Sequence, residues 1–134
     1  MLAVCSGLGV CVLAAPPAYA QVTPAAGAAT GELDRQYDEA FQEMLKQPAN
    51  LDVLFKFATV ASQTGDLEGA ISALERMLLV NADLPRVRLE LGVLYFRLGS
   101  TDAAAMYLEA ARASPEASKE TRERAETFLK AAVR

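Results

Sequence analysis

The sequence contains no histidine and no tryptophan, and its 13 lysine and arginine residues form no cluster. Without histidine the chain lacks the commonest general base and metal ligand, so a Ser-His-Asp triad is excluded. Nucleic-acid binding needs clustered basic residues, whereas the formal net charge here is −4. No glycine-rich phosphate loop follows a strand pattern. We therefore expect a protein that is not an enzyme, has no nucleic-acid partner, and binds no metal and no small-molecule cofactor.

Cysteine is confined to Cys5 and Cys11, which lie in an apolar N-terminal segment without a charged side chain. This segment is too short to cross a membrane, and it ends with small residues at Ala18 and Ala20, the pattern of a secretory cleavage site. We expect residues 1–20 to be a signal peptide, so that the mature chain has no thiol and is exported across the inner membrane to the periplasm. The alternative reading is an ordinary buried helix.

Two further segments precede the central part of the chain. Residues 21–31 contain Ala, Thr, Pro and Gly without an apolar period, which predicts a disordered linker. In residues 32–48 apolar side chains recur at spacings of three and four, from Leu33 to Leu45, and Pro48 follows. This pattern predicts an amphipathic helix, and its single apolar stripe is typical of a cap at the start of a solenoid.

The central part consists of two similar halves, 51–84 and 85–118, offset by 34 residues. In each half a predicted helix stops at a glycine, Gly65 or Gly99, and a second helix follows. Gly92 stands inside a helical pattern, where glycine costs about 1 kcal/mol relative to alanine, so we expect close helix packing there. The equivalent positions include Phe57 and Leu91, Ala58 and Gly92, Ala70 and Ala104, Leu74 and Leu108, and one mismatch, Leu54 and Arg88.

The predicted helix boundaries depend on capping residues. Asn50, Asp66 and Ser100 stand at N-cap positions, and Ser114 followed by Pro115 predicts the start of a last helix over residues 115–134. The four helices of the central part are expected at 51–64, 67–80, 85–98 and 101–113. Because no stop signal precedes the end of the sequence, we expect the last helix to be truncated and the chain to be a fragment of a longer protein.

A 34-residue period with small residues at helix contacts resembles the tetratricopeptide repeat (TPR) family. The second half matches the family pattern better, through Leu91-Gly92, Tyr95, Ala104, Leu108, Ala111 and Pro115. The resemblance implies an all-α fold, a TPR-like α-solenoid of antiparallel helix pairs with flanking helices. It places TPR repeat 1 at 51–84 and TPR repeat 2 at 85–118.

In the TPR family the first helix of each unit lines a concave groove that binds a protein or peptide. Carried over by register, the resemblance implies a partner-binding groove made of Asp52, Phe55, Thr59, Ser62, Gln63, Arg86, Leu89, Val93, Phe96 and Arg97. An apolar strip with arginines at its edges is suited to a peptide of some acidic character. The other reading is that the strip packs on another element of the same chain, including a downstream domain.

The runs 73–80 and 84–100 look like the periplasmic TPR portion of outer-membrane proteins of the surface lipoprotein assembly modifier type. This resemblance covers roughly residues 50–132. It implies a protein–protein interaction scaffold of the bacterial periplasm that forms the N-terminal part of an outer-membrane lipoprotein-assembly factor, tethered through a barrel after Arg134. A free-standing periplasmic adaptor in envelope or cell-wall assembly is the second hypothesis, and an enzyme accessory domain is the third.

Overall fold

The computed structural model describes residues 24–132, and within this part of the chain all regular structure is helical. The expected signal peptide, residues 1–20, lies outside the described residues. The helices are α1 (Pro24–Lys46), α2 (Leu51–Thr64), α3 (Leu67–Val80), α4 (Pro85–Arg97), α5 (Thr101–Ala113) and α6 (Lys119–Ala132). None of these helices is long and apolar enough to cross a lipid bilayer.

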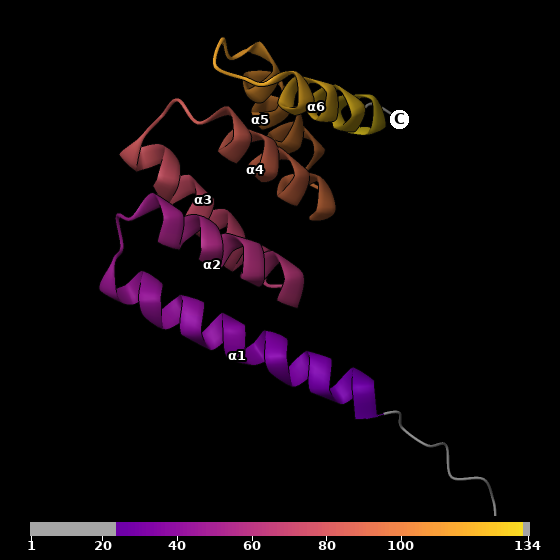
Figure 1. Cartoon of the computed structure of the whole chain (residues 1–134). Coiled ribbons are helices and arrows are strands. Elements are labelled where there is room, and N and C mark those ends of the chain that lie inside the picture. The colour runs from indigo at the N-terminus through magenta and orange to yellow at the C-terminus, as the bar shows by residue number, and fades with distance from the viewer. Residues whose placement is uncertain (1–23, 133–134) are drawn as a thin grey trace, which may run out of the picture.

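The helices stack in chain order, with α1 at one end of the array and α5 and α6 at the other (Figure 1). Each helix packs on the one that follows it, and α4 also contacts α6. The pairs α2/α3 and α4/α5 correspond to the two halves of the repeated sequence. The expected all-α, TPR-like arrangement of helix pairs with flanking helices is confirmed.

Local capping explains why α2 and α3 begin and end at the predicted residues. The side chain of Asn50 accepts hydrogen bonds from the backbone N–H groups of Asp52 and Val53, at 3.0 and 3.3 Å. Gly65 ends α2 with φ of 91°, and Gly99 occupies the equivalent turn with φ of 77°. Because side chains other than glycine rarely adopt this left-handed conformation, both tight turns depend on glycine.

Asp66 caps α3 and also ties it to α1. One carboxylate oxygen accepts from the backbone N–H of Gly69 at 2.9 Å, and the other accepts from the Tyr37 hydroxyl at 2.7 Å. Ser100 holds the equivalent N-cap position of α5, but its side chain makes no capping hydrogen bond.

Asp66→Ala is therefore expected to lower the free energy of unfolding by about 1–2 kcal/mol, since helix caps contribute roughly 0.5–2 kcal/mol. Ser100→Ala is the matched control and should cost only a few tenths of a kcal/mol, because no side-chain cap is lost. Urea denaturation followed by circular dichroism measures both. Equal losses in the two variants would contradict the capping role of Asp66.

Two apolar clusters hold the array together. The first cluster draws residues from α1, α2, α3 and α4 and contains the fully buried Leu54, Leu74 and Leu91. The second joins α4, α5 and α6 and consists of Leu89, Ala104, Leu108, Ala111 and Ala125. The units therefore depend on their neighbours for burial, as expected for short helices that are marginal alone.

Gly92 lies where α4 and α5 pack most closely. A Cβ atom at this position would lie 2.5 Å from Leu108 Cγ and 3.2 Å from the Ala104 carbonyl oxygen. Leu108 is fully buried and cannot move aside without disturbing the second cluster. Space, rather than helix propensity, therefore explains the glycine in this helix.

The start of α1 differs from the expectation. Residues 24–31 are helical, so the prediction of a disordered linker is wrong for this stretch, and residues 21–23 lie outside the described residues. The first helix begins eight residues earlier than residue 32. The physical reason is that alanine has the highest helix propensity and dominates this stretch, and that proline is favoured at a first helical position. The helix ends at Lys46, shortly before Pro48.

The start of α6 also differs, because it begins at Lys119 and not at Pro115. Its cap is Ser118, whose hydroxyl oxygen accepts from the backbone N–H of Thr121 at 3.1 Å. Ser114 instead closes the preceding turn: its hydroxyl accepts from the backbone N–H of Glu116 at 3.2 Å and donates to the Asp83 carboxylate at 3.4 Å. A contact with a distant loop thus overrides the local helix-start signal.

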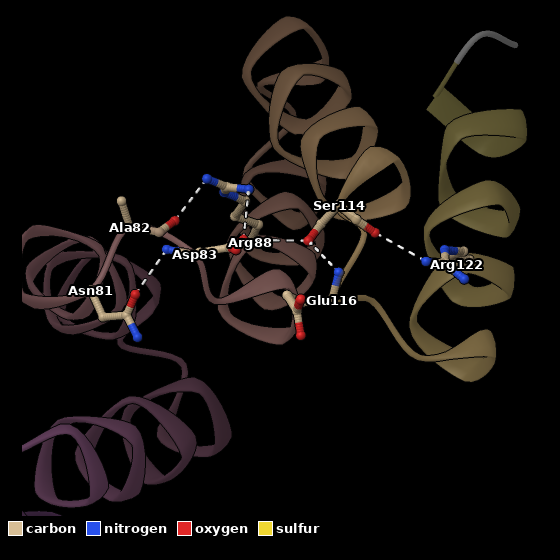
Figure 2. Close-up of polar contacts among 7 residues, drawn as sticks. All are labelled: Asn81, Ala82, Asp83, Arg88, Ser114, Glu116 and Arg122. Carbon is tan, nitrogen blue, oxygen red and sulfur yellow. Dashed lines mark hydrogen bonds and ion pairs between the residues drawn. The ribbon is translucent and has the colours of Figure 1, made fainter.

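Arg88, which replaces the leucine found at the equivalent position 54, reaches the loop between α3 and α4 (Figure 2). Its guanidinium donates to the Ala82 carbonyl oxygen at 2.7 Å and lies 3.9 Å from the Asp83 carboxylate. Arg122 of α6 donates to the Ser114 carbonyl oxygen at 3.1 Å on the other side of the same network. The mismatch in the repeat therefore has a structural role, since it anchors one interunit loop.

Candidate peptide-binding groove

A pocket of about 280 Å³ opens between α2 and α4, the first helices of the two units. Its lining consists of Phe55, Ala58, Thr59, Ser62, Gln63, Leu74, Arg86, Glu90 and Leu94. Half of the predicted groove set lies here, namely Phe55, Thr59, Ser62, Gln63 and Arg86. The volume falls just below the roughly 300–1,000 Å³ usual for small-molecule sites, so it suits one or two side chains of a partner.

The pocket has an apolar floor and a polar rim. Ala58, Leu74 and Leu94 are buried and form the floor, while Phe55 is half-buried at one side. Thr59 is exposed at the rim, and its hydroxyl donates to the Phe55 carbonyl oxygen at 2.8 Å. This arrangement follows from helical geometry, because residues three and four positions apart on α2 share one face.

Two arginines of α4 extend toward α2. The guanidinium carbon of Arg86 lies over the Phe55 ring, 5.0 Å from its centroid, in a cation–π contact. Arg97 donates to the Ser62 hydroxyl at 2.7 Å and to the Ser62 carbonyl oxygen at 3.4 Å. Both arginines remain exposed and so are open to a partner. Asp52 is also exposed but does not line the pocket.

The remaining three predicted groove residues lie outside this pocket and pack in or against the second cluster, to which α6 contributes. Leu89 is 1% exposed within the second cluster, and Val93 and Phe96 pack against the same cluster. The Phe96 and Phe128 rings meet edge to face with centroids 5.8 Å apart. These three positions agree with the second interpretation of the apolar strip, in which it packs on another element of the same chain. Helix α6 is that element.

Glu90 is not among the predicted groove residues, yet it lines the pocket, and its carboxylate lies 3.2 Å from the guanidinium of Arg124 on α6. A signal was present, because Glu90 lies one turn after Arg86 and therefore on the same helix face. A second hollow of about 240 Å³ continues from Arg86 toward α6, between α4 and Thr121. The concave surface thus runs across α2, α4 and α6.

Two tyrosines and a carboxylate form a cluster in which the pKa values of both tyrosines are raised. The Tyr95 hydroxyl donates to Glu75 at 2.8 Å, and the Tyr95 and Tyr107 rings stack with centroids 5.5 Å apart. The hydrogen bond to Glu75, with burial, raises the pKa of Tyr95 to about 12. Because Glu75 lies on α3, Tyr95 on α4 and Tyr107 on α5, this cluster joins three helices.

This raised pKa predicts a loss of stability in alkali. A tyrosine that ionises near pH 10 when unfolded and near 12 when folded binds more protons in the native state, so its contribution is fully present below pH 10. The free energy of unfolding should fall as the pH rises from 10 to 12, and Tyr95→Phe should make that fall shallower. Urea denaturation across this range measures it, and an identical slope in both proteins would contradict the assignment.

Within residues 24–132 no group of three or more acidic side chains is placed to hold a metal ion. The expectation of no catalytic residue remains a prediction from the missing histidine. What the concave face offers chemically is an apolar pocket with cations at its rim, which is suited to binding rather than to bond chemistry.

No family model matches the chain, and no curated protein matches its sequence. Solved structures do match, among them PcrH in complex with the chaperone binding region of PopD, with a TM-score of 0.68 and 18% identity over 81% of this chain and 84% of that chain. PcrH from Pseudomonas aeruginosa matches with a TM-score of 0.59 and 17% identity, over 78% of this chain and 93% of that chain. At these identities the likeness concerns the fold, and it is that of TPR-like helical repeat proteins.

Proposed function

We propose that the chain is a protein-binding scaffold that receives a peptide segment of its partner in the pocket between α2 and α4. The observation that carries the proposal is a pocket between two repeat units that has buried Ala58, Leu74 and Leu94 at its floor and exposed polar side chains at its rim. A buried apolar anchor in such a pocket commonly contributes most of the binding energy of an interface. The similar structure of PcrH was solved with a binding region of PopD, which supports a peptide as the kind of partner.

We also propose that the scaffold acts in the bacterial periplasm, as the N-terminal part of an outer-membrane lipoprotein-assembly factor. Support comes from the cleavage-site pattern before residue 21 and from the resemblance of the runs 73–80 and 84–100. The alternative is a free-standing periplasmic adaptor in envelope or cell-wall assembly. The intact mass of the native protein in each cell fraction separates them: an outer-membrane species much larger than 14.3 kDa favours the first, a smaller periplasmic species the second.

An uncleaved species in the cytosol would contradict both forms of this localisation. It would also return residues 1–20 to the folded chain, as the buried-helix reading of the sequence requires.

Site-specific photocrosslinking tests the groove itself. A photoreactive phenylalanine derivative replaces Thr59, which is exposed at the pocket rim, or Ser72, which is exposed on α3 outside the pocket. We expect the probe at position 59 to attach to one defined segment of a partner, identified by mass spectrometry, and the probe at position 72 not to do so. Attachment of the same segment at both positions, or at neither, would contradict a binding site between α2 and α4.

A further inference from the structure

The chemistry of the bound segment follows from two arginines that neutral groups hold in place. Arg86 is positioned by the Phe55 ring and Arg97 by the Ser62 hydroxyl. Within residues 24–132 neither guanidinium forms an ion pair with a carboxylate, so no salt bridge offsets either charge. Glu90, the carboxylate in the pocket lining, is already paired with Arg124.

Helical geometry places these two cations on the same face of α4. They are 11 positions apart, which is about three turns and about 16 Å along the helix axis. Leu94, part of the apolar floor, lies between them in the same helix. The pocket therefore has an apolar floor, Arg86 in its lining, and Arg97 beside it through the lining residue Ser62, and neither arginine is ion-paired within residues 24–132.

The spacing also selects a sequence pattern for an extended peptide. Side chains on one face of a strand recur every second residue, at about 3.3 Å per residue. Positions i and i+4 are thus about 13 Å apart and positions i and i+6 about 20 Å, and both differ from the axial separation of the two arginines by about 3 Å. The guanidinium groups, however, lie on Phe55 and Ser62, which are seven positions and about 10 Å apart along α2, so the four-residue spacing fits better. The side chain at i+2 then lies over the middle of the pocket.

We propose that the pocket binds an extended segment with two acidic residues four positions apart and a large apolar residue midway between them. The carboxylates pair with Arg86 and Arg97, and the apolar side chain covers Leu94 and its neighbours. A guanidinium that stacks on a ring keeps its N–H edge free for a carboxylate, so the contact with Phe55 is compatible with this pairing. The inference rests on the proposed function and specifies the partner segment.

The negative net charge of the chain means that attraction of an acidic segment depends on the two arginines. Because the formal charge is −4, long-range attraction does not favour an acidic partner, and the binding energy has to come from these local contacts. Paired and partly desolvated arginine–carboxylate contacts are directional and weaken with salt. Affinity for the acidic segment should therefore fall as the salt concentration rises, unlike affinity for a neutral segment.

The test is an NMR titration of the isotope-labelled chain with three nonapeptides. Their central residues are Asp-Ala-Leu-Ala-Asp, the neutral Asn-Ala-Leu-Ala-Asn, and Asp-Ala-Ser-Ala-Asp, which lacks the apolar anchor. We expect the first peptide to bind at least about tenfold more tightly than either of the others and to shift the signals of Thr59 and Gln63 at the pocket.

Two variants of the chain test whether each arginine pairs with a carboxylate of the acidic peptide. Arg86→Gln and Arg97→Gln should each weaken binding of the acidic peptide about threefold to tenfold and leave the affinity for the neutral peptide unchanged. The matched control is Arg112→Gln, an exposed arginine of α5 outside the pocket, which should leave every affinity unchanged. Circular dichroism of each variant shows that the fold is retained.

Three results would overturn the inference. One is equal affinity for the acidic and neutral peptides, which leaves the proposed function intact. Another is no shift at the pocket with any peptide, while crosslinking at Thr59 still captures a partner segment of different sequence. The third is self-association of the chain that Arg86→Gln abolishes, which would make a second copy the occupant. Failure of crosslinking at Thr59 is the separate sign that the proposed function itself is wrong.

Discussion

Leu54→Ala is expected to lower the free energy of unfolding by about 2–5 kcal/mol, the range measured when a buried leucine is cut back and a cavity remains. Leu54 has no exposed surface and belongs to the first cluster, which also contains Phe57 and Leu74 of the same unit and buried residues of α1 and α4. Because its neighbours belong to several helices, they cannot close the cavity by moving one side chain. Urea denaturation followed by circular dichroism at 222 nm gives the loss.

The same substitution at Leu79 serves as the control. This side chain is 86% exposed on α3, so Leu79→Ala should change the stability by less than about 0.5 kcal/mol. A loss for Leu54→Ala no greater than that for Leu79→Ala would contradict the placement of Leu54 in the core.

Gly92→Ala is expected to destabilise the fold by about 1–3 kcal/mol, although alanine is the better helix former by about 1 kcal/mol. The added methyl carbon would lie 2.5 Å from Leu108 Cγ, a distance that requires α4 and α5 to separate or Leu108 to leave its rotamer. Overpacking therefore outweighs propensity at this site. Gly92→Leu should lower the melting temperature further.

Gly31→Ala is the matched control, because Gly31 is exposed in α1 and an added Cβ would meet no atom within 4 Å. Here propensity acts alone, and stability should rise by up to about 1 kcal/mol. Opposite signs for the two substitutions would support the packing of α4 on α5, whereas stabilisation by both would contradict it.

Helix boundaries with local causes could be predicted from the sequence. Asn50 and Asp66 cap α2 and α3 through contacts within three residues, and Gly65 and Gly99 supply turn conformations that their own residue type permits. The repeat itself could be recognised because small residues must recur wherever helices pack closely. These features depend on the identity of one residue and its immediate neighbours.

Boundaries with distant causes could not be predicted. Ser114 and Pro115 form a good local start for a helix, but Ser114 bonds to Asp83, 31 residues earlier, and α6 begins four residues later than predicted. From the sequence, Arg88 could be recognised only as a mismatch between the two repeats. Its partner could not be predicted, because the side chain donates to the backbone carbonyl oxygen of Ala82 in a loop. Composition did not predict the helix over residues 24–31, because the helix propensity of alanine in this stretch prevailed over the helix-breaking tendency of glycine and proline.

The groove was half predictable for the same reason. Register brought Phe55, Thr59 and Arg86 to one pocket, because these positions depend only on the helix face and on the neighbouring unit. Their role in partner binding stays a prediction. The covered state of Leu89 depends on where α6 settles, and the sequence of α6 sets its apolar stripe but not its placement. The structure therefore places the candidate pocket between α2 and α4 and leaves Val93 and Phe96 outside its lining.

The stacking of each helix on its neighbours along the chain has a kinetic consequence. Folds dominated by contacts between nearby residues close short loops first, and such helical proteins fold within microseconds to milliseconds. Stacked arrays also open from their ends, so backbone amides of α1 and α6 should exchange with solvent sooner than those of α3 and α4, which have helices on both sides. A ligand lying across α2 and α4 would join two units that otherwise open in sequence, and its first detectable effect would be slower exchange in the middle of the array.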